Sequence, residues 1–231
     1  MFITEKELVV TLKQNYSEIC TWNTESEITK LLEEVNLGFG VADIVISKLR
    51  ASYNSLNEVE LNYFDLTIYK IVESSKGVTL DEIKKITRAS NQSIKASLEK
   101  LILESYINKE DTFYNIKNVY QHQIEETVAI EAKLKNWKRA LQQAYRYKWF
   151  ASLSYVVLDS KNINPAKRNI QEFEKYNVGL ATIAKNGSLD VIFKPYSEAP
   201  LDIKMQLLLN ELLKRSDLAY LERKKDFHIP K

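Results

Sequence analysis

The side chains that most often bind zinc or form disulfides are scarce in this sequence. Cys20 has no second cysteine to pair with, so no disulfide can form within the chain, and we expect a reducing, cytoplasmic environment. His122 and His228 do not supply the group of ligands that a zinc site requires. The chain has only five glycines and contains no glycine-rich loop that could cradle a phosphate. These absences exclude disulfide frameworks, zinc clusters and glycine-rich phosphate loops.

Long apolar runs and an excess of one charge are also missing. No window approaches about 18 consecutive apolar residues, and the opening MFITEKELVV lacks a basic stretch followed by an apolar one. We therefore expect neither a membrane-spanning nor a secreted protein. Because 33 basic residues face 31 acidic ones, any contact with nucleic acid must come from a local patch. The 45% hydrophobic content is that of a globular protein.

Residues 129–150 change from the periodicity of a strand to that of a helix. The first residues alternate, which places Glu131 and Lys133 together on one face of a strand. Asn136 is a suitable N-cap, and apolar residues recur at helical spacing after it. The segment carries six Lys or Arg residues against one acid, which favours an anionic partner. These basic residues are Lys133, Lys135, Lys138, Arg139, Arg146 and Lys148.

The chain before residue 50 predicts a helix and two strands. Residues 4–19 have helical periodicity, with a capping box that Glu7 completes. Residues 30–37 and 39–47 are rich in aliphatic side chains and predict strands. Asp43 interrupts the second strand, within GVADIVIS. Because aspartate is depleted in strands, Asp43 has either a satisfied structural position or a functional role, and the sequence leaves both open.

Residues 51–120 predict three helices followed by a hairpin, an order that resembles a winged helix-turn-helix. The expected helices are 61–72, 79–86 and 90–103, and the hairpin strands are 105–108 and 112–116. The resemblance implies that the third helix contacts DNA and that the hairpin is the wing. The exposed N-terminal end of this third helix carries Asn91, Gln92, Ser93 and Lys95. Because opposite charges nearly cancel from 84 to 117, a module for protein contacts or rigid spacing is an open alternative.

The last third of the chain predicts alternating strands and helices. The Asn186-Gly187 pair is a strong hairpin-turn signal, and Pro165 fits the first position of a helix. The expected elements are a strand at 152–158, a helix at 164–176, hairpin strands at 178–184 and 189–194, a helix at 200–215 and a charged tail at 218–231.

Without the inserted module, the chain resembles the PD-(D/E)XK nuclease superfamily. Members of that superfamily bring an Asp on one core strand together with a Glu-x-Lys on the next. The matching residues here are Asp43 in GVADIVI, and Glu131 and Lys133 in IEAKL. Glu-x-Lys also occurs at 82–84 and 222–224, but only Glu131 lies on a predicted strand that leads into a basic helix. One departure is Ala42, which stands where the family motif has proline.

Two further features extend the resemblance. Gln143 and Tyr147 in QAYRY are similar to the Gln-x-x-x-Tyr motif of the RecB-like branch. Glu5 or Glu7 could stand where many members place an additional acidic ligand. The implied fold is α+β or α/β, a restriction-endonuclease-like core with a mixed central sheet flanked by helices and interrupted by the winged helix. The expected domains are a core at 1–50 and 121–217, an insertion at 51–120 and a tail at 218–231.

The resemblance implies a metal-dependent DNA endonuclease that uses Mg²⁺ or Mn²⁺. Asp43 and Glu131, with the carbonyl of Ala132, would hold the metal. Lys133 would orient or deprotonate the attacking water, or stabilise the charge that develops on the phosphate. Gln143 and Tyr147 would position the backbone or a ligand. The residues expected to contact the phosphates of the DNA backbone are Arg139, Arg146 and Lys148.

Other functions stay open at this point. A non-catalytic DNA-binding regulator, or a partner-binding protein, could use the same nuclease-like scaffold. Cleavage of RNA or of branched DNA is a third alternative, since the motifs do not distinguish these substrates. A chain with one such site often cuts both strands of a duplex only as a dimer, so a homodimer is compatible with the sequence.

Overall fold

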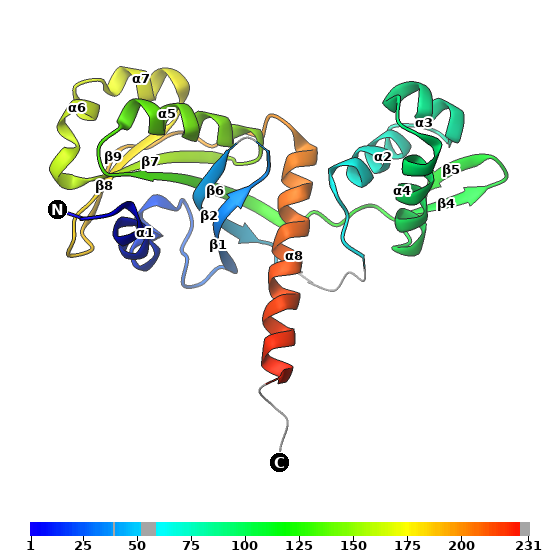
Figure 1. The fold of residues 1–231 in the computed structure, drawn as a ribbon, viewed down its shortest axis with the longest axis horizontal. Helices are drawn as coiled ribbons and strands as arrows, with labels where there is room; N and C mark the ends of the chain where they lie inside the picture. Colours follow the sequence, from blue (N-terminus) through cyan, green and yellow to red (C-terminus); the bar gives the residue numbers. More distant parts are fainter. Residues whose placement is uncertain (39, 52–58, 227–231) are drawn as a thin grey trace, which may run out of the picture. The chain divides into compact units, whose positions relative to one another are not determined.

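The computed structural model describes residues 1–38, 40–51 and 59–226 (Figure 1). The chain divides into two compact units, each built from two stretches of sequence. The first unit is a mixed α/β structure and the second consists of helices and a small antiparallel sheet. The first unit comprises Met1–Tyr53 and Gln123–Gln206, and the second comprises Asn54–His122 and Leu207–Lys231.

A six-stranded mixed sheet forms the centre of the first unit. Its strand order is β1-β2-β6-β7-β8-β9. β6 pairs antiparallel with β2 and parallel with β7, while β8 pairs parallel with β7 and antiparallel with β9. The two central strands β6 and β7 therefore have neighbours on both sides. The strands are β1 (Thr29–Asn36), β2 (Val41–Leu49), β6 (Ile124–Lys133), β7 (Leu153–Asp159), β8 (Gly179–Ile183) and β9 (Leu189–Phe193).

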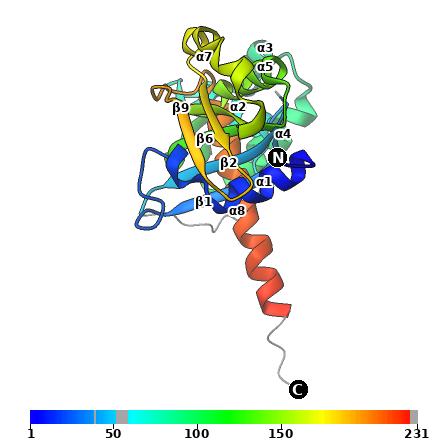
Figure 2. The same ribbon diagram turned by 90° about the vertical axis from the view of Figure 1, so that its left-hand side faces the viewer.

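Helices cover both faces of this sheet (Figure 2). On one face lies α1 (Glu5–Gln14), whose Leu8 and Leu12 belong to the same core as Ile44 of β2 and Ile130 of β6. The other face is covered by α5 (Trp137–Arg146), which contacts β6 and β7 (Figure 1). Because both faces are covered, β7 is buried along its whole length and β6 from Val128 to Ala132.

The strand expected around Glu131 is confirmed, and it is longer than predicted. β6 begins at Ile124, because residues from that position pair in register with β2. The helix expected after Asn136 is confirmed as α5, and the Asn136 side chain accepts a hydrogen bond from the backbone of Arg139. The two strands predicted before residue 50 are also present. Phe39, which the prediction placed at the start of the second strand, lies outside the described residues.

The single helix predicted at 4–19 is divided in two. α1 ends before Asn15, whose backbone leaves the helical region and whose side-chain amide donates to a carbonyl of the last turn. A short 3-10 helix, η1 (Tyr16–Ile19), follows. The predicted capping box is also incomplete, because the carboxylate of Glu7 accepts from the amide of Ile3, one residue earlier than expected. Asparagine side chains compete with the backbone for hydrogen bonds, which explains the interruption.

The helix predicted at 164–176 is divided for a similar reason. It consists of α6 (Asn164–Lys167) and α7 (Ile170–Tyr176). Between them, the side-chain amide of Asn169 donates to the carbonyl of Pro165 at 2.8 Å. This bond takes up a carbonyl of α6 and allows the chain to turn before α7 begins.

Within residues 59–122, the second unit contains three helices and a three-stranded antiparallel sheet. The capping box predicted at Thr79 is confirmed, because its amide donates to Glu82 Oε2 at 2.8 Å and its hydroxyl accepts from the Glu82 amide. The cap predicted at Ser90 is also confirmed. The strand order is β3-β5-β4. The elements are α2 (Tyr63–Glu73), β3 (Val78–Thr79), α3 (Leu80–Thr87), α4 (Asn91–Leu103), β4 (Ile107–Glu110) and β5 (Phe113–Ile116).

The last helix, α8 (Ile203–Asp226), differs from the expectation in two ways. From Leu207 onward it belongs to the second unit, where the sequence had assigned residues as far as 217 to the nuclease-like core. Glu211 fixes it there, since its carboxylate accepts from the hydroxyl of Tyr120 and from the amide of Leu61. The helix also continues to Asp226, so most of the predicted tail is helical; residues 227–231 lie outside the described residues.

Candidate active site

The side chains of Asp43, Glu131 and Lys133 lie on the same face of the central sheet. Their neighbours Ile44 and Ile130 point into the core beneath α1. Because side chains alternate along a strand, the three polar residues point to the opposite face, the one that α5 covers. The alternation expected for β6 is therefore confirmed. The polar face is covered as well, however, since only 1% of the Glu131 side chain is exposed.

Asp43 and β6 are joined by a direct hydrogen bond. The backbone pairing of β2 with β6 begins at Ile44, which lies opposite Ile130. One residue beyond this pair, the side chain of Asp43 forms the hydrogen bond to β6. Its Oδ2 accepts from the amide of Ala132 at 2.7 Å. In a strand the amide and the carbonyl of one residue point to the same side, so the Ala132 carbonyl also faces β2. The bond gives the unusual strand aspartate a satisfied structural position and places it beside Glu131.

Lys133 connects the acidic residues of the site. Its Nζ lies 3.0 Å from Glu131 Oε1 and 3.9 Å from Asp43 Oδ2. It also donates to Glu5 Oε2 at 3.1 Å, at the N-terminus of α1. Of the two acids considered on this helix, Glu5 thus reaches the site, and Glu7 bonds to the local backbone instead. One ammonium is shared among three carboxylates.

Burial and crowding change the protonation of this group. Burial raises the pKa of Asp43, and the hydrogen bond from Ala132 and the charge of Lys133 only partly offset it. Burial also raises the pKa of Glu131, with the charge of Asp43 acting in the same direction. Burial alone would lower the pKa of Lys133, but its hydrogen bond to Glu131 and the surrounding carboxylates raise it. The cluster therefore holds protons more strongly than isolated side chains do.

Tyr147 binds the same carboxylate from the opposite side. It follows α5 in a short 3-10 turn, η2 (Tyr147–Trp149), and its side chain is fully buried. Its hydroxyl donates to Glu131 Oε2, and its oxygen also lies 2.7 Å from the carbonyl oxygen of Val41. Burial and the bond to Glu131 raise the pKa of Tyr147, so the hydroxyl stays a donor. The sequence named Tyr147 but could not identify Glu131 as its partner.

Gln143 lies one turn before Tyr147 on α5. Its Oε1 is buried and has no hydrogen-bond partner among the described residues. A buried amide oxygen without a partner is costly, which is consistent with a site that is completed by a ligand. Of the two residues named in QAYRY, Tyr147 therefore bonds to Glu131, and Gln143 has an acceptor oxygen that no described residue uses.

The chemistry of these donors fits a divalent cation. Mg²⁺ and Mn²⁺ prefer carboxylate and carbonyl oxygens, and Asp43, Glu131 and the Ala132 carbonyl supply these. Burial raises the pKa of both carboxyl groups, and a bound cation would favour their ionised forms. Within residues 1–38, 40–51 and 59–226, no three His, Cys, Asp or Glu side chains gather closely enough to hold a metal by themselves. A metal at this site would therefore have two side-chain carboxylates and a backbone oxygen as its protein donors.

The three basic side chains expected to contact DNA phosphates differ in whether their charge is exposed or already paired. Arg139 and Arg146 are exposed on α5. Lys148 forms a 2.5 Å ion pair with Glu198 and donates to the carbonyl of Tyr176. The expectation for Lys148 is therefore weakened, because its charge is already neutralised, whereas the two arginines present theirs to solvent.

The residues expected to contact DNA in the second unit lie at the N-terminal end of α4. Asn91, Gln92, Ser93 and Lys95 are all exposed. The opposite side of the helix packs into the core of this unit through Ile94, Leu98 and Leu101. The hydroxyls of Ser90 and Ser93 also bond to each other at 2.9 Å.

Comparison of the chain with protein-family models finds no match, and comparisons with curated proteins and with solved structures find no significant match. Across the part of the chain that the structure describes, no helix has the length and apolar character needed to cross a membrane. The function must therefore be argued from the geometry of the site.

Proposed function

We propose that the chain is a metal-dependent nuclease that hydrolyses phosphodiester bonds in DNA, on a restriction-endonuclease-like core. The observation that carries this proposal is the meeting of Asp43 with Glu131 and Lys133 on one face of neighbouring strands, although residues 50–123 separate those strands in the sequence. Two carboxylates and a lysine at adjoining strand positions are the groups that such a reaction requires. The single buried cysteine is compatible with a cytoplasmic enzyme.

Asp43, Glu131 and the Ala132 carbonyl would hold the cation in this proposal. When bound, Mg²⁺ or Mn²⁺ supplies neutralisation of phosphate charge and a water of lowered pKa. Tyr147 keeps the Glu131 carboxylate in place through its hydroxyl. The buried Oε1 of Gln143 can accept a hydrogen bond from a water molecule.

Lys133 acts electrostatically in this proposal. The hydrogen bond to Glu131 and the surrounding carboxylates raise the pKa of Lys133, which favours the ammonium form and hence an electrostatic role. An ammonium beside the two carboxylates orients the attacking water and stabilises the negative charge that develops on the phosphate. Arg139 and Arg146 extend the positive surface along α5, where they would contact neighbouring phosphates.

The second unit would act as a winged helix that places the DNA. Its order of three helices and a hairpin, with α4 presenting Asn91, Gln92 and Lys95 to solvent, supports this role. Asparagine and glutamine match the hydrogen-bonding edge of adenine in the major groove, and lysine contacts phosphate. A homodimer with two active sites would cut both strands and give linear plasmid, whereas a monomer would mainly nick one strand. The ratio of nicked to linear product in the assay below distinguishes the two forms.

A nicking assay tests the proposal. Supercoiled plasmid should be converted to the open circular form by the wild-type protein with Mg²⁺ or Mn²⁺ and not with EDTA. Lys133→Ala should lose this activity and still retard DNA in a gel. No metal-dependent nicking by the wild-type protein on duplex, single-stranded or branched DNA would contradict the proposal.

The alternative is a non-catalytic DNA-binding protein on the same scaffold. One observation favours it: the hydrogen bond from Ala132 to Asp43 and the shared ammonium of Lys133 satisfy the carboxylates without a metal ion. In that case the wild-type protein would bind DNA through the second unit, and neither Mg²⁺ nor Mn²⁺ would change the DNA or bind at the site.

A further inference from the structure

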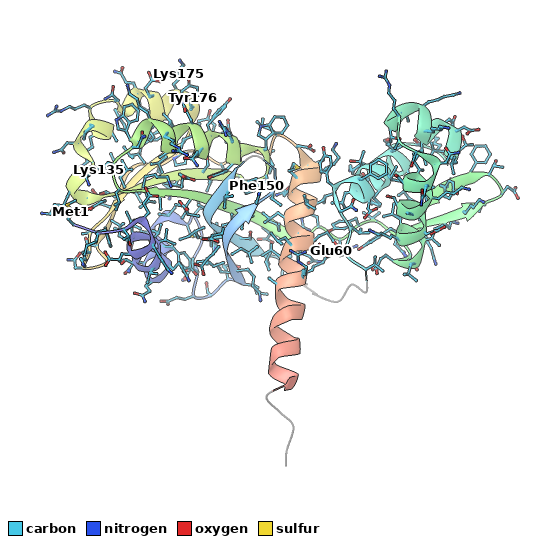
Figure 3. All side chains as sticks on the ribbon, in the orientation of Figure 1. Met1, Glu60, Lys135, Phe150, Lys175 and Tyr176 are labelled. Atoms are coloured by element: carbon cyan, nitrogen blue, oxygen red, sulfur yellow. The ribbon has the colours of Figure 1, made fainter. Side chains whose placement is uncertain are left out.

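A groove of about 860 Å³ opens between α5 and α7 in the first unit. Asp43, Glu131 and Lys133 are not among its lining residues. Tyr176 and its neighbour Lys175 lie at the C-terminal end of α7 (Figure 3). Residues that line the groove include Trp137, Lys138, Tyr145, Arg146, Glu172 and Tyr176.

Three aromatic rings from two helices face this groove. Tyr145 and Tyr176 form an edge-to-face pair with ring centroids 5.2 Å apart. Trp137 packs against the buried Phe173, with centroids 5.8 Å apart. The Tyr145 side chain nevertheless remains 45% exposed. Large rings that are held in place on one side and open on the other are surfaces on which a planar ligand can stack.

The groove is also positively charged. Lys138 and Arg146 line it and are exposed, and among the described lining residues Glu172 is the one acid. Lys138 Nζ lies 5.6 Å from the centroid of the Trp137 ring. Lys175, outside the lining itself, holds its Nζ 5.2 Å from the centroid of Tyr176. Positive charge beside open rings matches a ligand that carries both phosphates and aromatic bases.

We infer that this groove binds an unpaired strand of nucleic acid. Bases would stack on Tyr145, Tyr176 and Trp137, while Lys138 and Arg146 would neutralise the phosphates. A duplex does not fit this chemistry, because its base faces are covered by neighbouring base pairs. The inference rests on the proposed nuclease function and specifies its substrate as DNA with an unpaired segment beside the cut.

The chain connects the groove to the candidate active site. Arg146, which lines the groove, is followed directly by Tyr147, whose hydroxyl contacts Glu131. α5 therefore carries one side of the groove, and the turn η2 that directly follows it contacts the Glu131 carboxylate. A strand held along α5 would be bound by residues directly before the one that holds Glu131.

Fluorescence anisotropy of a labelled oligothymidylate of about 16 nucleotides measures this binding, since such a strand cannot form a duplex and is long enough for one binding groove. The whole 231-residue chain is titrated in EDTA, where no metal-dependent cleavage can occur. Tyr145→Ala and Tyr176→Ala should each weaken binding by about 5- to 150-fold, the range expected for the loss of one stacked base. Tyr145→Phe retains the ring and should bind like the wild-type protein.

Two controls separate stacking from nonspecific effects. Tyr196 is an exposed tyrosine that does not line the groove, so Tyr196→Ala should leave binding unchanged. Lys138→Gln and Arg146→Gln should each reduce the slope of log affinity against log salt by about 0.7, because each removes one phosphate contact. Lys6→Gln removes an exposed charge from α1 and should not change that slope.

The inference is overturned if Tyr145→Ala and Tyr176→Ala bind oligothymidylate as the wild-type protein does, or if they lose affinity equally for a blunt duplex. These outcomes are distinguishable from failure of the nuclease proposal, because binding in EDTA does not require cleavage. A protein that binds the unpaired strand through these tyrosines but never nicks DNA supports the groove and contradicts the nuclease. A protein that nicks DNA, but whose Tyr145→Ala and Tyr176→Ala variants bind oligothymidylate as the wild-type protein does, supports the nuclease and contradicts the groove.

Discussion

Lys133 Nζ lies 3.0 Å from Glu131 Oε1, and the two residues share one face of β6 because they are two positions apart. The Glu131 side chain is almost completely buried, whereas the Lys133 side chain is 17% exposed. The partner that neutralises Glu131 is therefore also the group that faces the solvent side of the site. This pairing couples the stability of the core to the charge of the candidate active site.

Removing Lys133 should destabilise the fold as well as stop cleavage. Lys133→Met leaves Glu131 buried without its cation, and we expect a loss of about 1–3 kcal/mol, below the figure for a fully buried pair because Lys133 is partly exposed. Urea unfolding at pH 7 measures this loss. The double variant Glu131→Gln/Lys133→Met should recover most of it. Purely additive losses in the double variant would show that the two side chains are not coupled.

The stability of the wild-type protein should depend on pH through Asp43 and Glu131. Both pKa values are raised by folding, so the stabilisation is complete below the ordinary carboxylate pKa and is lost as pH rises through the raised values. Glu131→Gln removes one of these groups and should make the unfolding free energy fall less over that interval. Chemical unfolding from acidic to neutral pH measures the difference. Glu18→Gln, at an exposed position, should keep the wild-type dependence; equal curves for both variants would contradict the account.

Tyr147→Phe should shift the pH dependence of cleavage. The Tyr147 hydroxyl lowers the pKa of Glu131, so its removal raises that pKa and moves the acidic limb of the pH–rate profile to higher pH. Loss of this bond to a buried carboxylate should also cost about 1.5–3 kcal/mol of stability. Single-turnover rates from pH 5 to pH 9, about the range over which such groups titrate, measure the shift. An unshifted limb in Tyr147→Phe, identical to that of the control Tyr196→Phe, would mean that Glu131 does not limit the rate.

The triple variant Asn91→Ala/Gln92→Ala/Lys95→Ala should bind duplex DNA less tightly. Each lost base contact is worth about 1–3 kcal/mol, and the lost phosphate contact should reduce the salt slope by about 0.9. The variant should melt like the wild-type protein, because the opposite face of α4 carries the packing. Gel retardation at several salt concentrations, with Lys6→Ala as the matched loss of charge, checks this. Unchanged affinity and cut-site preference would assign the second unit to protein contacts or spacing.

Local periodicity made much of this structure predictable. The alternation around Glu131, the cap at Asn136 and the caps at Thr79 and Ser90 all depend on residues within a few positions of one another. Such short-range preferences operate before the chain has packed, and they can be read from the sequence alone. The common face of Glu131 and Lys133 is of this kind.

The rest depends on contacts between distant residues. The bond from Ala132 to Asp43 requires the β2–β6 register, and nothing near either residue encodes it. The contact of Tyr147 with Glu131 requires the packing angle of α5 on the sheet. The apolar stripe of α8 predicted a helix but could not show that it packs in the second unit from Leu207 onward. The division of helices by asparagine side chains was also missed, because asparagine bonds the backbone only in some contexts.

The central claim, that Asp43 and Glu131 form a metal-dependent catalytic site, is tested most directly by nicking of supercoiled plasmid under single-turnover conditions. The wild-type protein, Asp43→Asn, Glu131→Gln and the surface control Glu18→Gln are compared in Mg²⁺, after gel retardation has shown equal DNA binding. We predict that the wild-type protein and Glu18→Gln produce open circles at the same rate, and that Asp43→Asn and Glu131→Gln produce none above the EDTA background. Nicking by all four proteins at one rate would contradict the account.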